Sequence, residues 1–204
     1  MSYFASRRSF LSHGLAFSGL ALSGLALLPG AALAASAAQA EQLVQGLVGD
    51  VNAVIASGAS ESAMIAQFER IFVRYGDMPY IAAYVMGADG RRATGAQKKA
   101  FTAAFQGYAA RKYGKQFRQF VGSEITVSGT QKVKNAYQVA TVAKLRGQSP
   151  FEVTFFVGEK SGRFYNMYVE GVNMLLTERT EIGAMLDRRR GDIDAMIADL
   201  RKAG

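Results

Sequence analysis

The side chains that most often carry out catalysis are nearly absent from this chain. Its 204 residues include no cysteine and one histidine, His13, close to the N-terminus. A nucleophile activated by an imidazole base, and any thiolate chemistry, need residues that the rest of the chain does not have. No glycine-rich phosphate loop of useful spacing is present either. The sequence therefore lacks the usual signatures of an active site.

Three carboxylates in the second half of the chain are the remaining candidates for acid–base work. Glu124, Glu152 and Glu170 could pair across a sheet as general acid and base. The alternative is that two of them lie on a polar sheet face and that Glu170, next to Gly171, has a structural role. We favour this alternative and expect a protein that is not an enzyme, with a small-molecule enzyme on a cone-shaped α+β scaffold as the competing hypothesis.

A second acidic group lies near the C-terminus. Its members are Asp187, Asp192, Asp194 and Asp199. Carboxylates of this kind can bind a divalent cation, but here they alternate with Arg188, Arg189, Arg190, Arg201 and Lys202. This alternation is typical of a solvated, ion-paired helical face. We expect no metal site and no cofactor.

The first 34 residues have the pattern of an export signal. Ser-Arg-Arg-Ser-Phe-Leu at residues 6–11 precedes an acid-free apolar run over 15–28, and small residues at 32–34 favour cleavage near Ala34. The paired arginines resemble the twin-arginine signal, and an ordinary secretory signal is the alternative. Cleavage would remove His13 and lower the formal charge from +8 to +6. Residues 35–204 would then form one domain, because about 170 residues suffice for a single core.

Apolar periodicity predicts helices first and strands later. Helices are expected over 38–57, between Ser60 and Gly76, over 78–86, from Thr94 to about Phe120, and over 177–190 and 192–202. Alternation with a period of two predicts four strands around 125–127, 133–145, 151–157 and 165–169, with turns at 128–129, 147–150 and 161–162. The connections are too short for crossover helices. The expected fold is α+β, with helices packed on one curved antiparallel sheet of about four strands.

Large apolar side chains are unusually frequent in the expected domain. Phenylalanines and tyrosines recur on the helices and strands, together with several methionines. Periodicity alone favours a well-filled core over a ligand cavity.

Several segments together resemble the MlaC-like family of periplasmic phospholipid-binding proteins, also called the toluene-tolerance family. The segments are Arg163–Ile182, Arg74–Ala82, Tyr84–Gly87, Ala93–Phe101 and Gly191–Asp194, and they follow the family's order and spacing. The resemblance covers nearly all of residues 35–204. The chain departs from the family pattern at Gly162, where a tryptophan is usual, and at Asn166 and Asn173, where aspartate and serine are usual.

The resemblance implies a soluble periplasmic carrier that hides phospholipid acyl chains in an apolar cavity between helices and sheet. It would shuttle lipid between an outer-membrane lipoprotein complex and an inner-membrane ABC transporter with an MCE-type subunit. The implied cargo is phospholipid, nucleic acid is not expected as a partner, and the protein is expected to be a monomer.

We expect inward-facing residues to line the lipid cavity. The candidates are Tyr84, Val85, Phe101, Phe105, Tyr108, Phe117, Val139, Phe155, Met167, Val169 and Val172. A third hypothesis is a pure interaction module with a closed core, in which a basic helix carrying Lys98, Lys99, Arg111 and Lys112 docks on an acidic partner.

Overall fold

The computed structural model describes residues 35–117, 124–145 and 147–204. The expected export signal lies outside the described residues. The elements in chain order are α1 (Ala37–Ala56), α2 (Glu61–Tyr75), α3 (Met78–Met86), the short 3₁₀ helix η1 (Gly87–Arg91), α4 (Gly95–Phe117), β1 (Glu124–Val133), β2 (Ala136–Lys144), β3 (Phe151–Gly158), β4 (Phe164–Val169), β5 (Val172–Asn173), α5 (Met174–Arg188) and α6 (Ile193–Leu200). Within these ranges, none of the helices combines the length and the apolar character needed to cross a membrane.

The strands form one antiparallel sheet in the order β1-β2-β3-β4-β5, so each strand pairs with its neighbours in sequence. Val139 pairs with Phe155, and Phe155 pairs with Met167. Because side chains of directly paired residues lie on the same face, these three share the inner face of the sheet. The α+β fold with one antiparallel sheet is confirmed.

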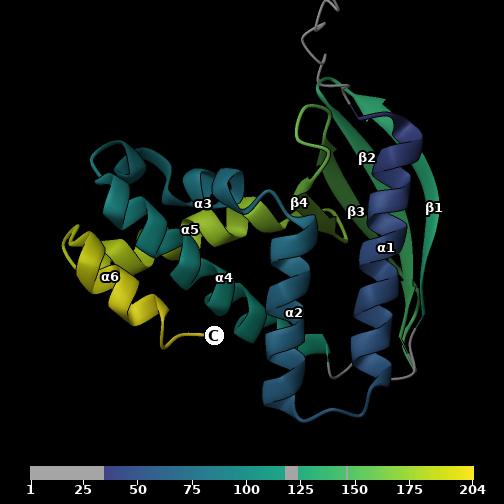
Figure 1. Ribbon diagram of the computed structural model, residues 1–204, viewed down its shortest axis with the longest axis horizontal. Helices are drawn as coiled ribbons and strands as arrows, with labels where there is room; N and C mark the ends of the chain where they lie inside the picture. The colour runs from purple at the N-terminus through teal and green to yellow at the C-terminus, as the bar shows by residue number, and fades with distance from the viewer. Residues whose placement is uncertain (1–34, 118–123, 146) are drawn as a thin grey trace, which may run out of the picture. The chain divides into compact units, whose positions relative to one another are not determined.

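The helices pack on this sheet and on each other (Figure 1). Helix α1 lies along β1 and β2, and α2 packs between α1 and α4. Helix α3 contacts α4 and α5, α5 contacts β4, and α6 packs against α4 and α5. The buried core therefore continues from the inner face of the sheet into the spaces between the helices.

Helix starts agree with the predicted caps, with one difference. The side chains of Ser60 and Asp77 cap α2 and α3, and Thr94 and Gln97 bond each other's backbone N–H groups at the start of α4. Helix α5 begins three residues earlier than predicted, because the Asn173 side chain accepts a hydrogen bond from the backbone of Leu176 and caps the helix there.

Two turns of the sheet differ from the prediction. The turn expected at Ser128 and Gly129 is wrong: β1 continues through these residues as a bulge, where the pairing register shifts between Val127 and Gly129. The first hairpin turns instead after Val133, with Lys134 at a φ of 54°. Glu170 and Gly171, both with positive φ, form a second tight turn and create the short strand β5. The sheet therefore has five strands rather than about four.

Gly76 joins the end of α2 to β4. It forms an isolated bridge with Phe164, and the backbone of Asp77 donates to the Phe164 carbonyl at 2.7 Å. The guanidinium of Arg163 donates to the carbonyls of Val73, Arg74 and Gly76. A Cβ at residue 76 would lie 2.7 Å from the Phe72 carbonyl oxygen and 3.2 Å from the Phe164 ring. Only glycine permits this close approach.

Gly76→Ala is expected to destabilise the domain by about 1–3 kcal/mol, the usual range for forcing extra atoms into a packed site. Gly49 provides a matched control, because it lies in α1 and a Cβ there has nothing within 4 Å. Gly49→Ala should instead stabilise the domain by up to about 1 kcal/mol through helix propensity. Urea unfolding of both variants measures the difference. Equal stability of the two variants would contradict the argument.

Candidate functional site

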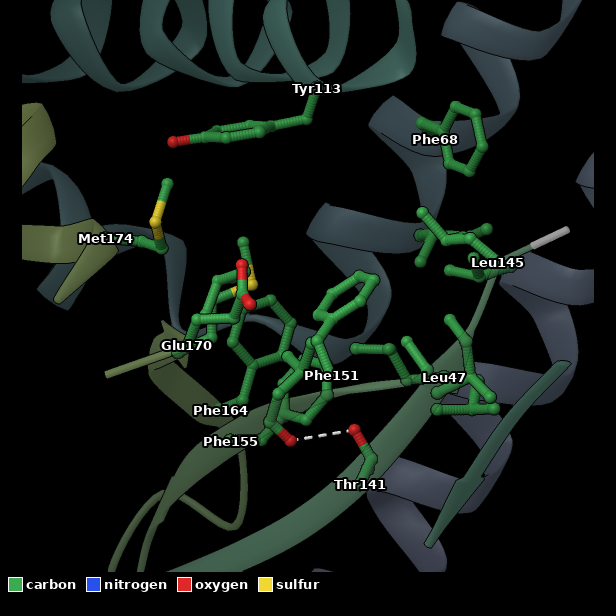
Figure 2. Close-up of a pocket in the computed structure, with 18 of the residues that line it drawn as sticks. Leu47, Phe68, Tyr113, Thr141, Leu145, Phe151, Phe155, Phe164, Glu170 and Met174 are labelled. Carbon is green, nitrogen blue, oxygen red and sulfur yellow. Dashed lines mark hydrogen bonds between the residues drawn. The ribbon is translucent and has the colours of Figure 1, made fainter. Parts of the chain in front are cut away.

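A cavity of about 700 Å³ lies between the inner face of the sheet and helices α1, α2 and α4 (Figure 2). Its lining comprises Leu47, Val48 and Val51 of α1, Phe68, Ile71 and Phe72 of α2, Tyr113 of α4, Ile125, Thr141, Ala143, Leu145, Phe151, Val153, Phe155, Phe164, Met167 and Val169 of the sheet and its ends, Gln148, Ser149, Glu170, and Met174 of α5. Most of these side chains are apolar. A volume of this size is typical of small-molecule and lipid-sized sites.

The polar groups of the lining fall into two kinds. Thr141 and Tyr113 are buried. The Thr141 hydroxyl donates to the Val153 carbonyl at 2.7 Å and the Tyr113 hydroxyl donates to Glu178, so neither needs a hydrogen-bond partner from a ligand (Figure 2). Gln148, Ser149 and Glu170 are exposed to solvent. The cavity therefore has an apolar interior and a polar rim, an arrangement suited to an amphiphile.

A smaller hollow of about 60 Å³ adjoins the cavity on the side of α4 and α5. Phe72, Tyr113, Phe164, Met167 and Met174 line both spaces. Because the two spaces share these lining side chains, rotation of a flexible methionine can change the space available to a ligand. The smaller hollow extends the apolar surface toward the helical core.

A polar cluster joins α4 to α5 beside this hollow. The ammonium of Lys112 lies 2.7 Å from Glu178 Oε1 and 2.6 Å from Glu181 Oε2. The hydroxyl of Tyr108 donates to Glu181 at 2.7 Å, and that of Tyr113 donates to Glu178. Glu178 is buried, and its second oxygen, Oε2, has no hydrogen-bond partner among the described residues. Two carboxyl groups thus share one ammonium, and one of them, Glu178, is buried whereas the other, Glu181, is partly exposed.

Burial and the neighbouring carboxylates raise the pKa of both Tyr108 and Tyr113. Burial opposes the charge of Lys112, but its hydrogen bonds to Glu178 and Glu181 outweigh this and raise its pKa. Burial likewise opposes ionisation of Glu181, yet the bonds from Lys112 and Tyr108 leave its pKa lowered. The tyrosines stay protonated and Lys112 stays charged at neutral pH, so these three groups hold their protons rather than exchange them.

The predicted lipid-binding residues occupy different places in the structure. Phe155, Met167 and Val169 line the cavity, and Phe105 and Met167 line the smaller hollow. Val85, Phe101, Tyr108 and Val139 are buried outside both linings, Tyr84 contacts the guanidinium of Arg179, Val172 is exposed, and the side chain of Phe117 lies outside the described residues. Lipid contact by these residues stays a prediction.

Several cavity residues were missed by the sequence reasoning. They include Val51 of α1, Phe68 of α2, and Thr141 and Val153 of the sheet. The signal was available on the strands, because Thr141 lies two residues after Val139 and Val153 lies two residues before Phe155, and residues two apart share a sheet face. On the helices, the apolar stripes showed which face points inward. They did not show which neighbouring element that face contacts.

The carboxylates considered for catalysis do not converge. The backbone N–H of Glu170 donates to the Glu152 carbonyl, but Glu170 lines the cavity whereas Glu152 lines a hollow on the other face of the sheet. Glu124 lies at the start of β1 and is exposed. These positions do not assemble a pair of acids around one ligand.

The C-terminal aspartates have separate structural contacts. Asp192 caps α6, Asp199 forms two hydrogen bonds with the guanidinium of Arg189, and Asp194 accepts one from Gln97. Over the described ranges, no group of three or more acidic or histidine side chains is arranged to hold a metal ion.

The fold is that of a solved structure. A phospholipid-binding protein from Ralstonia solanacearum, determined in complex with a phospholipid, matches with a TM-score of 0.67 at 17% sequence identity, covering 79% of this chain and 98% of that chain. The sequence model of one protein family, described as MlaC protein, matches residues 41–202. That match spans nearly all of the domain built from α1 to α6, and the chain therefore belongs to the MlaC family.

Proposed function

We propose that this protein is a periplasmic phospholipid carrier that shields acyl chains in the cavity between helices and sheet. The observation that carries the proposal is the cavity itself, about 700 Å³ with an apolar interior and a polar rim. Membership of the MlaC family and the phospholipid bound to a protein of the same fold support the same function. The proposed role is transport without catalysis.

Such a carrier needs to hold the acyl chains only about as favourably as the membrane does. Two acyl chains of about 30 methylenes gain roughly 24 kcal/mol on leaving water, at about 0.8 kcal/mol each, which exceeds any non-covalent affinity. The lipid, however, leaves a bilayer in which these groups are already dry. A cavity lined by adaptable aromatic and methionine side chains need only match that environment, and both loading and release remain possible.

The proposed route runs between two membranes. The export signal expected at residues 1–34 would place the domain in the periplasm, by the twin-arginine pathway in our proposal. The proposed partners are an outer-membrane lipoprotein complex and an inner-membrane ABC transporter with an MCE-type subunit. Of the four basic residues considered for a docking helix, Arg111 donates to the carbonyls of Leu200 and Ala203, and Lys112 belongs to the polar cluster with Glu178 and Glu181. Lys98 and Lys99 are the exposed pair available to a partner.

The carrier function predicts that the purified protein contains phospholipid. Mass spectrometry of an organic extract should detect about one phospholipid per protein, and protein stripped of lipid should take up labelled phospholipid from vesicles. Stripped, folded protein that takes up none would overturn the proposal.

Replacing both Arg7 and Arg8 by lysine tests the export route separately. Export by the twin-arginine pathway should fail in this variant.

A further inference from the structure

Glu170 has a backbone conformation that does not suit its residue type. Its φ is 48°, and Gly171 follows with a φ of 80°, which together make the tight turn between β4 and β5. Glycine, asparagine and aspartate are the residues favoured at both positions of such a turn. A glutamate there is strained relative to glycine, and turn formation does not explain its presence.

The side chain of Glu170 lies at the cavity. It is exposed to solvent and forms part of the rim with Gln148 and Ser149, and Figure 2 shows its carboxylate among the apolar side chains of the lining. In the described part of the chain it has no ion pair and no side-chain hydrogen bond, whereas the carboxylate of Glu152, on the other sheet face, accepts one from Thr154. It is also the one charged side chain among the described lining residues.

A negative charge at the rim of a lipid cavity discriminates between headgroups. With the acyl chains in the apolar interior, as the proposed function requires, the headgroup of a bound phospholipid would lie near the polar rim. A carboxylate there attracts a cationic amine, and an ammonium can also donate hydrogen bonds to it. The same carboxylate repels a headgroup whose net charge is negative. Both effects favour a headgroup that carries an ammonium over a headgroup whose net charge is negative.

We propose that Glu170 selects the cargo by its headgroup, favouring zwitterionic phospholipids with an ammonium group over anionic phospholipids. The proposal rests on the proposed carrier function and names the lipid class that its cavity takes. Strain at this turn is then the cost of placing a carboxylate at the rim.

The test is a competition between two lipids. Stripped protein is equilibrated with vesicles of equal parts phosphatidylethanolamine and phosphatidylglycerol with identical acyl chains, and the bound lipids are quantified by mass spectrometry. Wild-type protein should be enriched in phosphatidylethanolamine. Glu170→Gln should reduce that enrichment by about two- to fivefold, the range expected for one solvent-accessible charge contact. Glu170→Gly should show the same loss while raising the urea midpoint, because it relieves the strained φ.

Two residues provide matched controls for the backbone effect. Lys134 and Arg190 have φ values of 54° and 53°, and neither lines the cavity. Lys134→Gly and Arg190→Gly should raise stability without changing the lipid ratio. Wild-type protein that binds both lipids equally, or Glu170→Gln with the wild-type ratio, would overturn this inference and leave the carrier function standing. Absence of any lipid uptake would instead overturn the carrier function.

Discussion

Val153→Trp is expected to remove phospholipid binding from a protein that still folds. Val153 lies in the middle of the sheet, paired with Thr141 on one side and Val169 on the other, and its half-buried side chain lines the cavity. An indole there occupies space that acyl chain would fill. Displacing about four methylenes costs about 3 kcal/mol, which corresponds to about a hundredfold in affinity. The measurement is phospholipid per protein in an organic extract, together with the melting temperature.

The neighbouring residue supplies the control. Thr154 lies next to Val153 on the same strand, but it lines a hollow on the opposite face of the sheet. Thr154→Trp adds an indole of the same size to the same strand and should leave lipid content at the wild-type level. A Val153→Trp protein with full lipid content would show that the acyl chains do not occupy this cavity.

Local sequence signals predicted most of the fold because each depends on few residues. The caps at Ser60, Asp77 and Thr94 place three helix starts correctly, since a capping side chain acts within its own first turn. The error at Ser128 and Gly129 has the same local origin: a small polar residue followed by glycine is equally suited to a turn and to a bulge. Only pairing with β2 distinguishes these, and pairing is not local.

The cavity was harder to predict because it depends on which elements face each other. Period-two alternation correctly put Phe155 and Met167 on the inner face of the sheet. The aromatic run on α4 has equally clear periodicity, yet Phe101 stacks on Phe105 and is fully buried outside the cavity lining. An inward-facing residue that packs on another helix and one that meets ligand have the same pattern in the sequence. Helix packing decides between them.

Lys112→Met should destabilise the domain more than any surface change. Lys112 is the cation shared by Glu178 and Glu181, and the side chain of Glu178 is only 5% exposed. Removing the ammonium leaves a buried carboxylate uncompensated, which costs about 3–5 kcal/mol in comparable cases. Urea unfolding at neutral pH measures this. Glu181→Gln is the control: its side chain is 45% exposed, and a pair with this exposure contributes about 1 kcal/mol or less.

The origin of that loss can be tested by removing the second charge. Glu178→Gln added to Lys112→Met keeps an oxygen acceptor for the Tyr113 hydroxyl but leaves no uncompensated charge, so the double variant should recover most of the lost stability. A double variant as unstable as Lys112→Met would show that lost packing by the lysine stem, and not charge, explains the effect.

The same cluster should make wild-type stability depend on pH at both the acidic and the basic end. In wild-type protein the pKa of Glu181 is lowered from 4.5, so its contribution is present above that pH and is lost as the pH falls below it. The pKa values of Tyr108, Tyr113 and Lys112 are raised, so the unfolded chain loses these protons first and stability falls above about pH 10. Urea unfolding of wild-type protein across the pH range measures both effects. Stability should stay level around neutral pH, fall below about pH 4.5 as Glu181 takes up a proton, and fall above about pH 10 as the unfolded chain loses the tyrosine and lysine protons.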